Sequence, residues 1–122
     1  MDEPYDIEVE PEVAEWLDTL PLEHFLKVDQ KAGELAESPL TLGEPRSKYL
    51  GDGVRELRFT LGAGHVRLTY WLTDRRSVVL LTWFYKTRPR EEVQVQRAKD
   101  AKKVCEAEHG PAHEDYEWKG DA

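Results

Sequence analysis

Three neighbouring segments with strand-like patterns limit the folds open to this chain more than any other feature. In residues 54–59 the apolar Leu57 and Phe59 alternate with polar residues, and residues 66–70 repeat this alternation after a glycine-containing turn. The third segment, residues 78–84, is almost entirely apolar. Because successive side chains of a strand point to opposite faces of its sheet, each alternating segment buries one face. The connections have hairpin length, so we predict an antiparallel meander.

Charged side chains fall on the polar face of this predicted meander. If Leu57 points into the core, its neighbours Glu56 and Arg58 point away from it. Arg67 has the same outward position on the next strand, and Lys86 directly follows the third segment. Guanidinium and ammonium groups fixed on a rigid sheet suit a phosphate-rich ligand. We therefore predict a group of catalytic residues made of Arg58, Arg67, Lys86 and Glu56.

The rest of the chain supplies helices that cover the sheet. Apolar residues recur at helical spacing in three stretches bounded by proline or glycine. Residues 38–53 are rich in glycine and proline and are expected to form a loop. We predict an α+β fold with a small antiparallel-rich sheet, two N-terminal helices on one face, an open second face and a C-terminal helix. The expected elements are strands over residues 5–9, 54–59, 66–70 and 78–84, and helices over residues 11–20, 22–35 and 90–108.

Length and composition fit one domain in a reducing compartment. A chain of 122 residues can bury one modest core, which we place in residues 1–109, with residues 110–122 as a polar, acidic tail expected to be mobile. Cys105 is the single cysteine, so an internal disulfide is excluded and a cysteine cage for a metal has too few ligands. No apolar run approaches the roughly 18 residues of a membrane span, and the N-terminus is acidic. We expect a cytoplasmic protein without a membrane partner.

The formal net charge of −8 hides a strong segregation of charge along the chain. Residues 1–45 carry two basic and thirteen acidic groups, a net −11, and residues 104–122 carry one and six, a net −5. Residues 46–103 carry fourteen basic and six acidic groups, a net +8. The segment that contains the meander is therefore basic, which favours a nucleic-acid partner. The alternative is that acidic helices merely solvate one side of the protein.

The motifs of most hydrolases are missing from this sequence. It has no Gly-x-Ser-x-Gly elbow and no phosphate-binding Gly-x-x-x-x-Gly-Lys loop, and we expect no metal and no cofactor. RNA, however, provides its own nucleophile, the 2′-OH beside each phosphate. An enzyme that orients this hydroxyl and stabilises the charge on phosphorus needs no metal. Two arginines as a clamp and a lysine as point charge or proton carrier would serve this reaction.

Further residues near the meander are candidates for contact with RNA. Exposed aromatic side chains such as Tyr85, Trp71 or Trp83 could stack an unpaired base, although tryptophans at such positions more often belong to the core. Equally, Arg58 could simply pair with Glu56. The predicted RNA-binding residues are Arg55, Tyr85, Arg88, Arg90 and Lys48.

On these residues the chain resembles the RelE/HigB-type toxins of bacterial type II toxin–antitoxin systems, in a phage-derived subgroup frequent in actinobacteria. The resemblance covers roughly residues 5–109 and is carried by residues 50–59, 66–68, 80–88 and 97–109. It implies a small sheet with packed helices and cleavage of mRNA in the A site of the 70S ribosome. It also implies a cognate antitoxin, often of the helix-turn-helix type, that neutralises the toxin.

The resemblance assigns roles to some residues and departs from the family at others. Arg67 matches the arginine of the middle strand that contacts the scissile phosphate, and Arg58 matches a basic position on the preceding strand. Lys86 and Arg88 match the basic group after the last strand. Glu56 stands where other RelE members carry a lysine proposed as general base, and the terminal helix lacks their tyrosine. The proton-transfer groups therefore stay open, with Glu56 as a candidate base.

Three functions are compatible with this sequence. The first is a ribosome-dependent mRNA endonuclease acting as a toxin. The second is a ParE-like inhibitor of DNA gyrase, a related fold that has no need of a phosphate clamp. The third is a non-catalytic module that binds an antitoxin or regulates an operon. The cation cluster favours the first.

Overall fold

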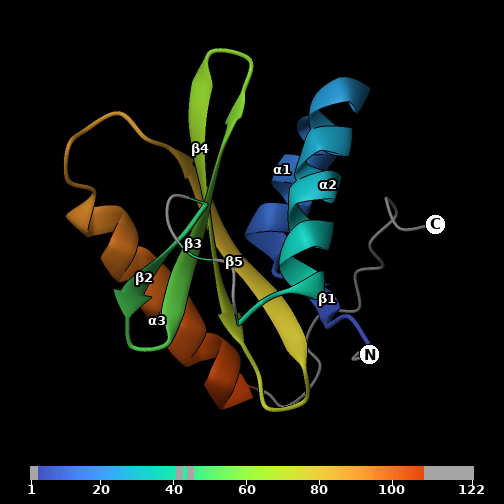
Figure 1. The fold of residues 1–122 in the computed structure, drawn as a ribbon. Helices are drawn as coiled ribbons and strands as arrows, with labels where there is room; N and C mark the ends of the chain where they lie inside the picture. The colour runs from blue at the N-terminus through green and yellow to red at the C-terminus, as the bar shows by residue number, and fades with distance from the viewer. Residues whose placement is uncertain (1–2, 41–42, 44–45, 109–122) are drawn as a thin grey trace.

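One mixed sheet organises the part of the chain that the computed structural model describes, residues 3–40, 43 and 46–108. Its strands run in the order β1-β5-β4-β3-β2, with β1 parallel to β5 and the other neighbours antiparallel (Figure 1). The predicted α+β class and the meander β3-β4-β5 are confirmed. The elements are β1 (Asp6–Val9), α1 (Pro11–Thr19), α2 (Leu22–Glu37), β2 (Ser47–Gly51), β3 (Val54–Leu61), β4 (Gly64–Leu72), β5 (Ser77–Tyr85) and α3 (Glu92–Glu108).

Strand β2 corrects the prediction that residues 38–53 form a loop. Residues Ser47–Gly51 pair antiparallel with β3, with an irregularity between Tyr49 and Gly51. The glycines lie at the turn that follows, where Gly51, Asp52 and Gly53 all have positive φ. Glycine adopts this conformation without steric cost, so the glycines mark a hairpin turn. Because glycines are so frequent in this segment, the sequence pattern does not reveal the short strand β2 that precedes the turn.

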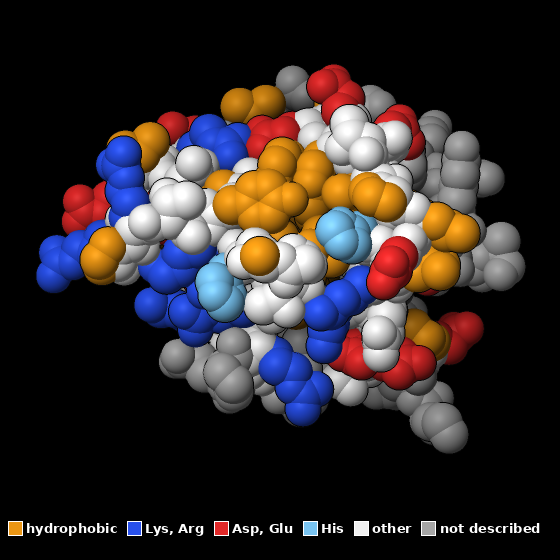
Figure 2. Space-filling view, turned by 90° about the horizontal axis from the view of Figure 1, so that it is seen from above, with side chains coloured by type: hydrophobic (Ala, Val, Ile, Leu, Met, Phe, Trp, Pro, Cys, Tyr) orange, Lys and Arg blue, Asp and Glu red, His pale blue; other side chains and the backbone are white. Residues whose placement is uncertain are grey.

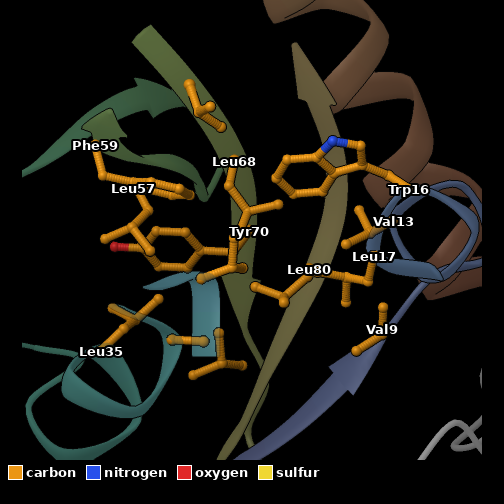
Figure 3. Close-up of a cluster of buried hydrophobic side chains, with 14 of the residues drawn as sticks. Val9, Val13, Trp16, Leu17, Leu35, Leu57, Phe59, Leu68, Tyr70 and Leu80 are labelled. Atoms are coloured by element: carbon orange, nitrogen blue, oxygen red, sulfur yellow. The ribbon is translucent and has the colours of Figure 1, made fainter. Parts of the chain in front are cut away.

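Helices α1 and α2 cover one face of the sheet and form the larger core with it (Figures 1 and 3). Pro11 opens α1, whose buried side chains are Val13, Trp16 and Leu17. The strands contribute inward residues such as Leu57, Leu68, Tyr70 and Leu80, as the alternation predicts. Tyr70 is fully buried and its hydroxyl forms a 2.6 Å hydrogen bond with that of Ser47, which satisfies the one polar atom of this side chain.

Leu22, the apolar residue at the start of α2, is not in the core. Leu22 is 71% exposed, whereas Val28, Ala32 and Leu35 are buried. Leu22 is the first residue of α2, and a helix that crosses a sheet contacts it mainly along its middle and far turns. Its side chain therefore lies on the surface.

Helix α3 packs on the second face of the sheet, so the prediction that this face is open was wrong in part. Ala98 and Cys105 of α3 are buried against Val54, Val79 and Leu81 in a second, smaller core. Small side chains on the helix allow a close approach to the sheet, and they give α3 only a weak apolar pattern in the sequence. Beyond the reach of this contact, the face remains accessible.

The backbone of β5 extends past the end of β1, and side chains from both helical layers bind it there. The Trp83 N–H donates to Oε2 of Glu12 in α1 at 3.3 Å, and Nη2 of Arg97 in α3 donates to the Trp83 carbonyl at 3.1 Å. Arg97 and Glu12 also form an ion pair with each other. At Trp83 these two side chains take the place of a neighbouring strand.

The thiol of Cys105 should be a sensitive probe of α3 packing. Burial raises its pKa from 9.0 to about 11, so at a given pH the thiolate fraction is lower by about a hundredfold. We expect alkylation by iodoacetamide at pH 8 to be at least about a hundredfold slower than in the urea-unfolded chain, followed by mass spectrometry. Equal rates would show that α3 does not stay on the sheet.

Two further predictions concern membrane-spanning helices and the C-terminal tail. In the described residues no helix is both long and apolar enough to cross a membrane. The predicted tail, residues 110–122, lies outside the described residues, and the assignment of residues 1–109 to one domain stays a prediction.

Candidate functional site

A pocket of about 400 Å³ opens where α3 leaves the second face of the sheet uncovered. The strands form its floor, and the loop after β5 together with the first turns of α3 forms a wall. Five basic and three acidic side chains line it, so positive charge prevails. The sheet contributes Lys48, Leu50, Glu56, Arg58, Arg67 and Phe84, and the loop and α3 contribute Lys86, Pro89, Arg90, Glu91, Glu92, Val95 and Gln96.

Two arginines of adjacent strands flank a carboxylate at the floor of this pocket. Arg58 and Arg67 are directly paired across β3 and β4. Oε1 of Glu56 lies 3.7 Å from Nε of Arg58 and 3.8 Å from Nε of Arg67. These distances are too long for hydrogen bonds, and within the described residues Nε of Arg67 is buried without a hydrogen-bond partner. A buried donor without a partner is uncommon in folded proteins, so the floor of this pocket is an unusual environment.

Burial and the neighbouring charges both shift the pKa values of Glu56 and Arg67. Burial raises the pKa of Glu56 above 4.5, while the neighbouring cations, Arg67 first and Arg58 second, oppose the rise. Burial and the repulsion from Arg58 lower the pKa of Arg67, and Glu56 and Glu91 oppose this change. A carboxylate with a raised pKa is a stronger base than an ordinary one, which makes Glu56 better suited to accept a proton.

The loop after β5 is held by hydrogen bonds that fix Lys86 in the pocket wall. Nζ of Lys86 donates to the carbonyls of Arg88 at 2.6 Å and Pro89 at 3.2 Å. Oε1 of Glu91 accepts the backbone N–H groups of Thr87 at 3.1 Å and Arg88 at 2.9 Å. One carboxylate and one ammonium thus close the loop into a compact turn, and Lys86 lines the same pocket as the two arginines.

Removing the Glu91 carboxylate should loosen this loop. We expect Glu91→Ala to speed hydrogen exchange at the Thr87 and Arg88 amides by about tenfold, because each loses a charge-assisted hydrogen bond. Glu91→Gln keeps an acceptor oxygen and should restore most of the protection. Unchanged exchange in Glu91→Ala, measured by NMR, would show that the loop is held by other contacts.

The pocket brings together six of the nine predicted site residues, and the other three lie elsewhere. Arg55 is on the opposite face of β3, where its guanidinium lies 5.0 Å from the centre of the Tyr49 ring. Tyr85 lies on the same face as Trp83 at the end of β5, and Arg88 is exposed on the loop. The residues that line the pocket are Glu56, Arg58, Arg67, Lys86, Lys48 and Arg90.

The aromatic residues considered as base platforms do not face this pocket. Trp83 is stacked on Trp16, with ring centroids 4.6 Å apart, and the edge of Tyr85 meets Trp83. Trp71 packs against the α3 core beneath Lys102, whose Nζ is 4.8 Å from its ring centre. Phe84 lines the pocket instead, because it is one residue out of phase with Trp83 on β5.

Several lining residues were missed in the sequence. Leu50 belongs to β2, where the density of glycine and proline predicts a loop, so the sequence does not place it beside β3. Val95 precedes the buried Ala98 by about one helical turn, and this spacing is the signal that could place it toward the sheet. Gln96 and Glu91 carry no comparable signal, since polar residues in the first turns of a helix and just before it are common.

The segregation of charge along the chain is also a segregation in space. The acidic helices α1 and α2 lie on the face opposite the pocket, because Leu57 and Phe59 contact them while Glu56 and Arg58 face the other way. Seen from the end that carries the β3–β4 hairpin, Lys and Arg side chains gather to the left and below, with hydrophobic side chains in the centre (Figure 2). In the described residues no cluster of three or more His, Cys, Asp or Glu is arranged to hold a metal ion.

Comparison with known proteins identifies the family of this sequence. A family model described as "phage derived protein Gp49-like" matches residues 15–105, most of the chain. The chain belongs to this Gp49-like family. No curated protein matches the sequence significantly. The resemblance predicted from the sequence is confirmed for the family and for the fold.

Three solved structures of RelE toxins share the fold of this Gp49-like protein. The toxin of the RelBE2 toxin–antitoxin complex from Mycobacterium tuberculosis is 25% identical, with a TM-score of 0.55 over 72% of this chain and 98% of that one. A mutant of the Escherichia coli toxin RelE in the free state is 19% identical, with a TM-score of 0.58 over 84% and 100%. The archaeal RelE of the RelE–RelB complex from Pyrococcus horikoshii is 22% identical, with a TM-score of 0.53 over 73% and 100%.

Proposed function

We propose that this Gp49-like protein is the toxin of a type II toxin–antitoxin system and a metal-independent endoribonuclease that cuts mRNA in the ribosomal A site. The observation that carries the proposal is the convergence of Arg58, Arg67 and Lys86 on one accessible pocket with Glu56 at its floor. A phosphodiester placed there would lie beside the forked N–H donors of Arg58 and Arg67, from β3 and β4, and beside the Glu56 carboxylate.

The side chains of the pocket account for each part of the reaction. The Glu56 carboxylate accepts the proton of the 2′-OH, and the 2′ oxygen attacks the adjacent phosphorus. Arg58 and Arg67 stabilise the charge that builds on the non-bridging oxygens. The bond from phosphorus to the 5′ oxygen breaks, and this oxygen takes a proton for which the Lys86 ammonium is the candidate donor. The products are a 2′,3′-cyclic phosphate and a 5′-OH.

An antitoxin partner is part of the same proposal. Relatives with this fold have been solved in complex with antitoxins, in the RelBE2 and RelE–RelB complexes. We propose a cognate antitoxin, of the helix-turn-helix type, that neutralises the protein by closing access to the pocket. Co-purification of the chain with the product of a neighbouring reading frame, and relief of toxicity on co-expression, tests this partner.

Induced expression in cells without antitoxin tests the activity. We expect translation to stop and new mRNA 5′ ends to map within A-site codons, and we expect the double variant Arg67→Ala, Lys86→Ala to abolish both effects. DNA damage with intact mRNA would instead indicate a gyrase inhibitor. Harmless expression of the folded wild-type chain would indicate a non-catalytic binding module.

A further inference from the structure

The side chains of β5 change faces once along the strand. Leu80 points into the core under α1 and α2 (Figure 3), and Leu81 points toward α3. Continued alternation would send Trp83 to the α3 side of the sheet and Phe84 into the larger core. The structure shows the opposite, because Trp83 packs on the larger core and Phe84 lines the pocket. The alternation is therefore reversed between Leu81 and Trp83.

An extra residue on β5 causes this reversal. Thr69 of β4 is paired with Thr82, whereas the next residue, Tyr70, is paired with Leu80. Leu81 is thus inserted into β5, and Leu81 and Thr82 together oppose Thr69, which is the arrangement of a β-bulge. The insertion shifts the phase of the rest of the strand by one residue.

The hydroxyl group of Thr69 holds this bulge from the neighbouring strand. The Thr82 N–H donates to Oγ1 of Thr69 at 3.0 Å, and the Thr69 hydroxyl donates to the Thr82 carbonyl at 3.2 Å. The hydroxyl oxygens of the two threonines are 2.6 Å apart and share a further hydrogen bond. Both residues are buried, so their polar groups need partners inside the protein. A single side chain of β4 therefore satisfies both peptide groups of the bulged residue.

The bulge lies directly beside the charged floor of the pocket. Thr69 is the cross-strand neighbour of Glu56 on β3 and of Thr82 on β5. Arg67 lies two residues earlier on β4, on the same face of the sheet, and its neighbour on β5 is Phe84. A change in the register of β5 at Thr82 would therefore change the side chain that lies next to Arg67.

We propose that Thr69 is a positioning residue for the cleavage of RNA, because it holds the bulge that keeps Phe84 beside Arg67. The inference rests on the proposed function and deepens it. With a regular β5, Trp83 would take the place of Phe84 next to Arg67. The larger indole would crowd the guanidinium group, and the stacking of Trp83 on Trp16 would be lost. Bulges next to active sites commonly serve to re-aim a side chain in this way.

Two substitutions of Thr69 in the full-length chain test this role. Thr69→Val has nearly the same shape but lacks the hydroxyl group. We expect it to lower the rate of A-site cleavage at saturating mRNA by about 10–100-fold, because small displacements of the groups around a reacting phosphate have effects of this size. Thr69→Ser keeps the hydroxyl group and should cut at close to the wild-type rate, although loss of the buried methyl group lowers its melting temperature.

NMR spectroscopy of the same variants reports the register of β5 and does not depend on activity. In the wild type and in Thr69→Ser we expect cross-strand contacts between Arg67 and Phe84, which are paired in the sheet. In Thr69→Val these contacts should weaken, and the Thr82 amide should exchange with solvent at least about tenfold faster, because it loses its acceptor. Unchanged contacts and exchange in Thr69→Val would show that the hydroxyl group does not hold the bulge.

Thr73→Val is the matched control at the other end of the same two strands. The Thr73 hydroxyl accepts the Ser77 N–H at 3.1 Å, a buried bond between side chain and backbone that lies outside the pocket. We expect a loss of melting temperature similar to that of Thr69→Val, together with the wild-type rate of cleavage. An equal loss of cleavage in both valine variants would mean that Thr69 acts only through stability, which would overturn the proposal.

The outcomes separate this inference from the function on which it rests. Suppose that Thr69→Val loses the contacts between Arg67 and Phe84 and still cuts mRNA at the wild-type rate. The positioning role would then be overturned and the nuclease kept. A wild-type chain that does not cut mRNA would overturn the nuclease and the positioning role together, whatever register the NMR spectra show.

Discussion

Replacing Arg67 by alanine should reduce mRNA cleavage by about two to three orders of magnitude, the usual cost of removing one donor that stabilises the charge of a transition state. Arg67 is the most buried of the pocket cations that pair with Glu56, with 11% of its side chain exposed against 25% for Arg58. A charge in such a setting is weakly screened by solvent and acts strongly on a bound phosphate. The rate is measured as appearance of A-site cuts on a defined mRNA with purified ribosomes.

Two controls separate lost chemistry from lost structure in Arg67→Ala. Arg67→Lys keeps the positive charge but loses the planar pair of N–H donors of the guanidinium group. We therefore expect a cleavage rate between those of the wild type and Arg67→Ala. Arg75→Ala removes an arginine that pairs with Glu8 outside the pocket, and it should cut at the wild-type rate. The melting temperature of each variant shows whether it is folded. A folded Arg67→Ala with undiminished cleavage would mean that the pocket is not where RNA is cut.

Replacing Glu56 by glutamine should remove the general base and lower cleavage by about 10²–10⁴-fold. Glutamine has nearly the same shape and keeps an acceptor oxygen toward the arginines, so loss of the ionisable group is the main change. Glu56→Asp, which keeps a carboxylate on a shorter side chain, should retain more activity than Glu56→Gln. If Glu56→Gln cleaved at the wild-type rate, Glu56 would not be the general base, and the charges of the arginines would account for catalysis.

The pH dependence gives an independent test of the same residue. Because the pKa of Glu56 is raised above 4.5, wild-type cleavage should rise with pH through this raised value and then level off as the carboxyl group becomes fully ionised. Glu56→Gln should lack this rising limb. The stability of the fold should depend on pH in the opposite direction. The contribution of Glu56 to the free energy of unfolding is full below pH 4.5 and is lost as the pH rises through the folded-state pKa. Chemical denaturation at several pH values measures it.

The parts of the fold that could be predicted are those with a repeating apolar pattern. The meander and the stripes of α1 and α2 are long enough for the pattern to be specific. Strand β2 has only five residues and is followed directly by Gly51 and Gly53, so the local signal of a turn outweighed that of a strand. The covering of the second face by α3 depended on Ala98 and Cys105, small residues that carry little weight in a hydrophobic pattern.

The candidate site followed from strand alternation where residues lie on paired strands. Glu56, Arg58 and Arg67 were placed together because alternation and hairpin pairing fix which neighbouring side chains share a face. The same rule, applied to Arg55 and Tyr85, would have placed them on the other face. Their basic or aromatic character was given more weight than their position. The apolar lining residues Leu50, Phe84 and Val95 come from segments far apart in the sequence, which no local pattern could bring together.

The side chains that close the backbone of β5 at Trp83 have a consequence for how the protein behaves at high concentration. A strand with free peptide groups along its side can recruit a second chain and start fibrous growth. Here Glu12 and Arg97 bind the Trp83 peptide groups from two different helical layers. The overhanging stretch of β5 therefore offers no template for intermolecular pairing at Trp83, and a strongly apolar strand can end near the surface without making the protein prone to aggregate there.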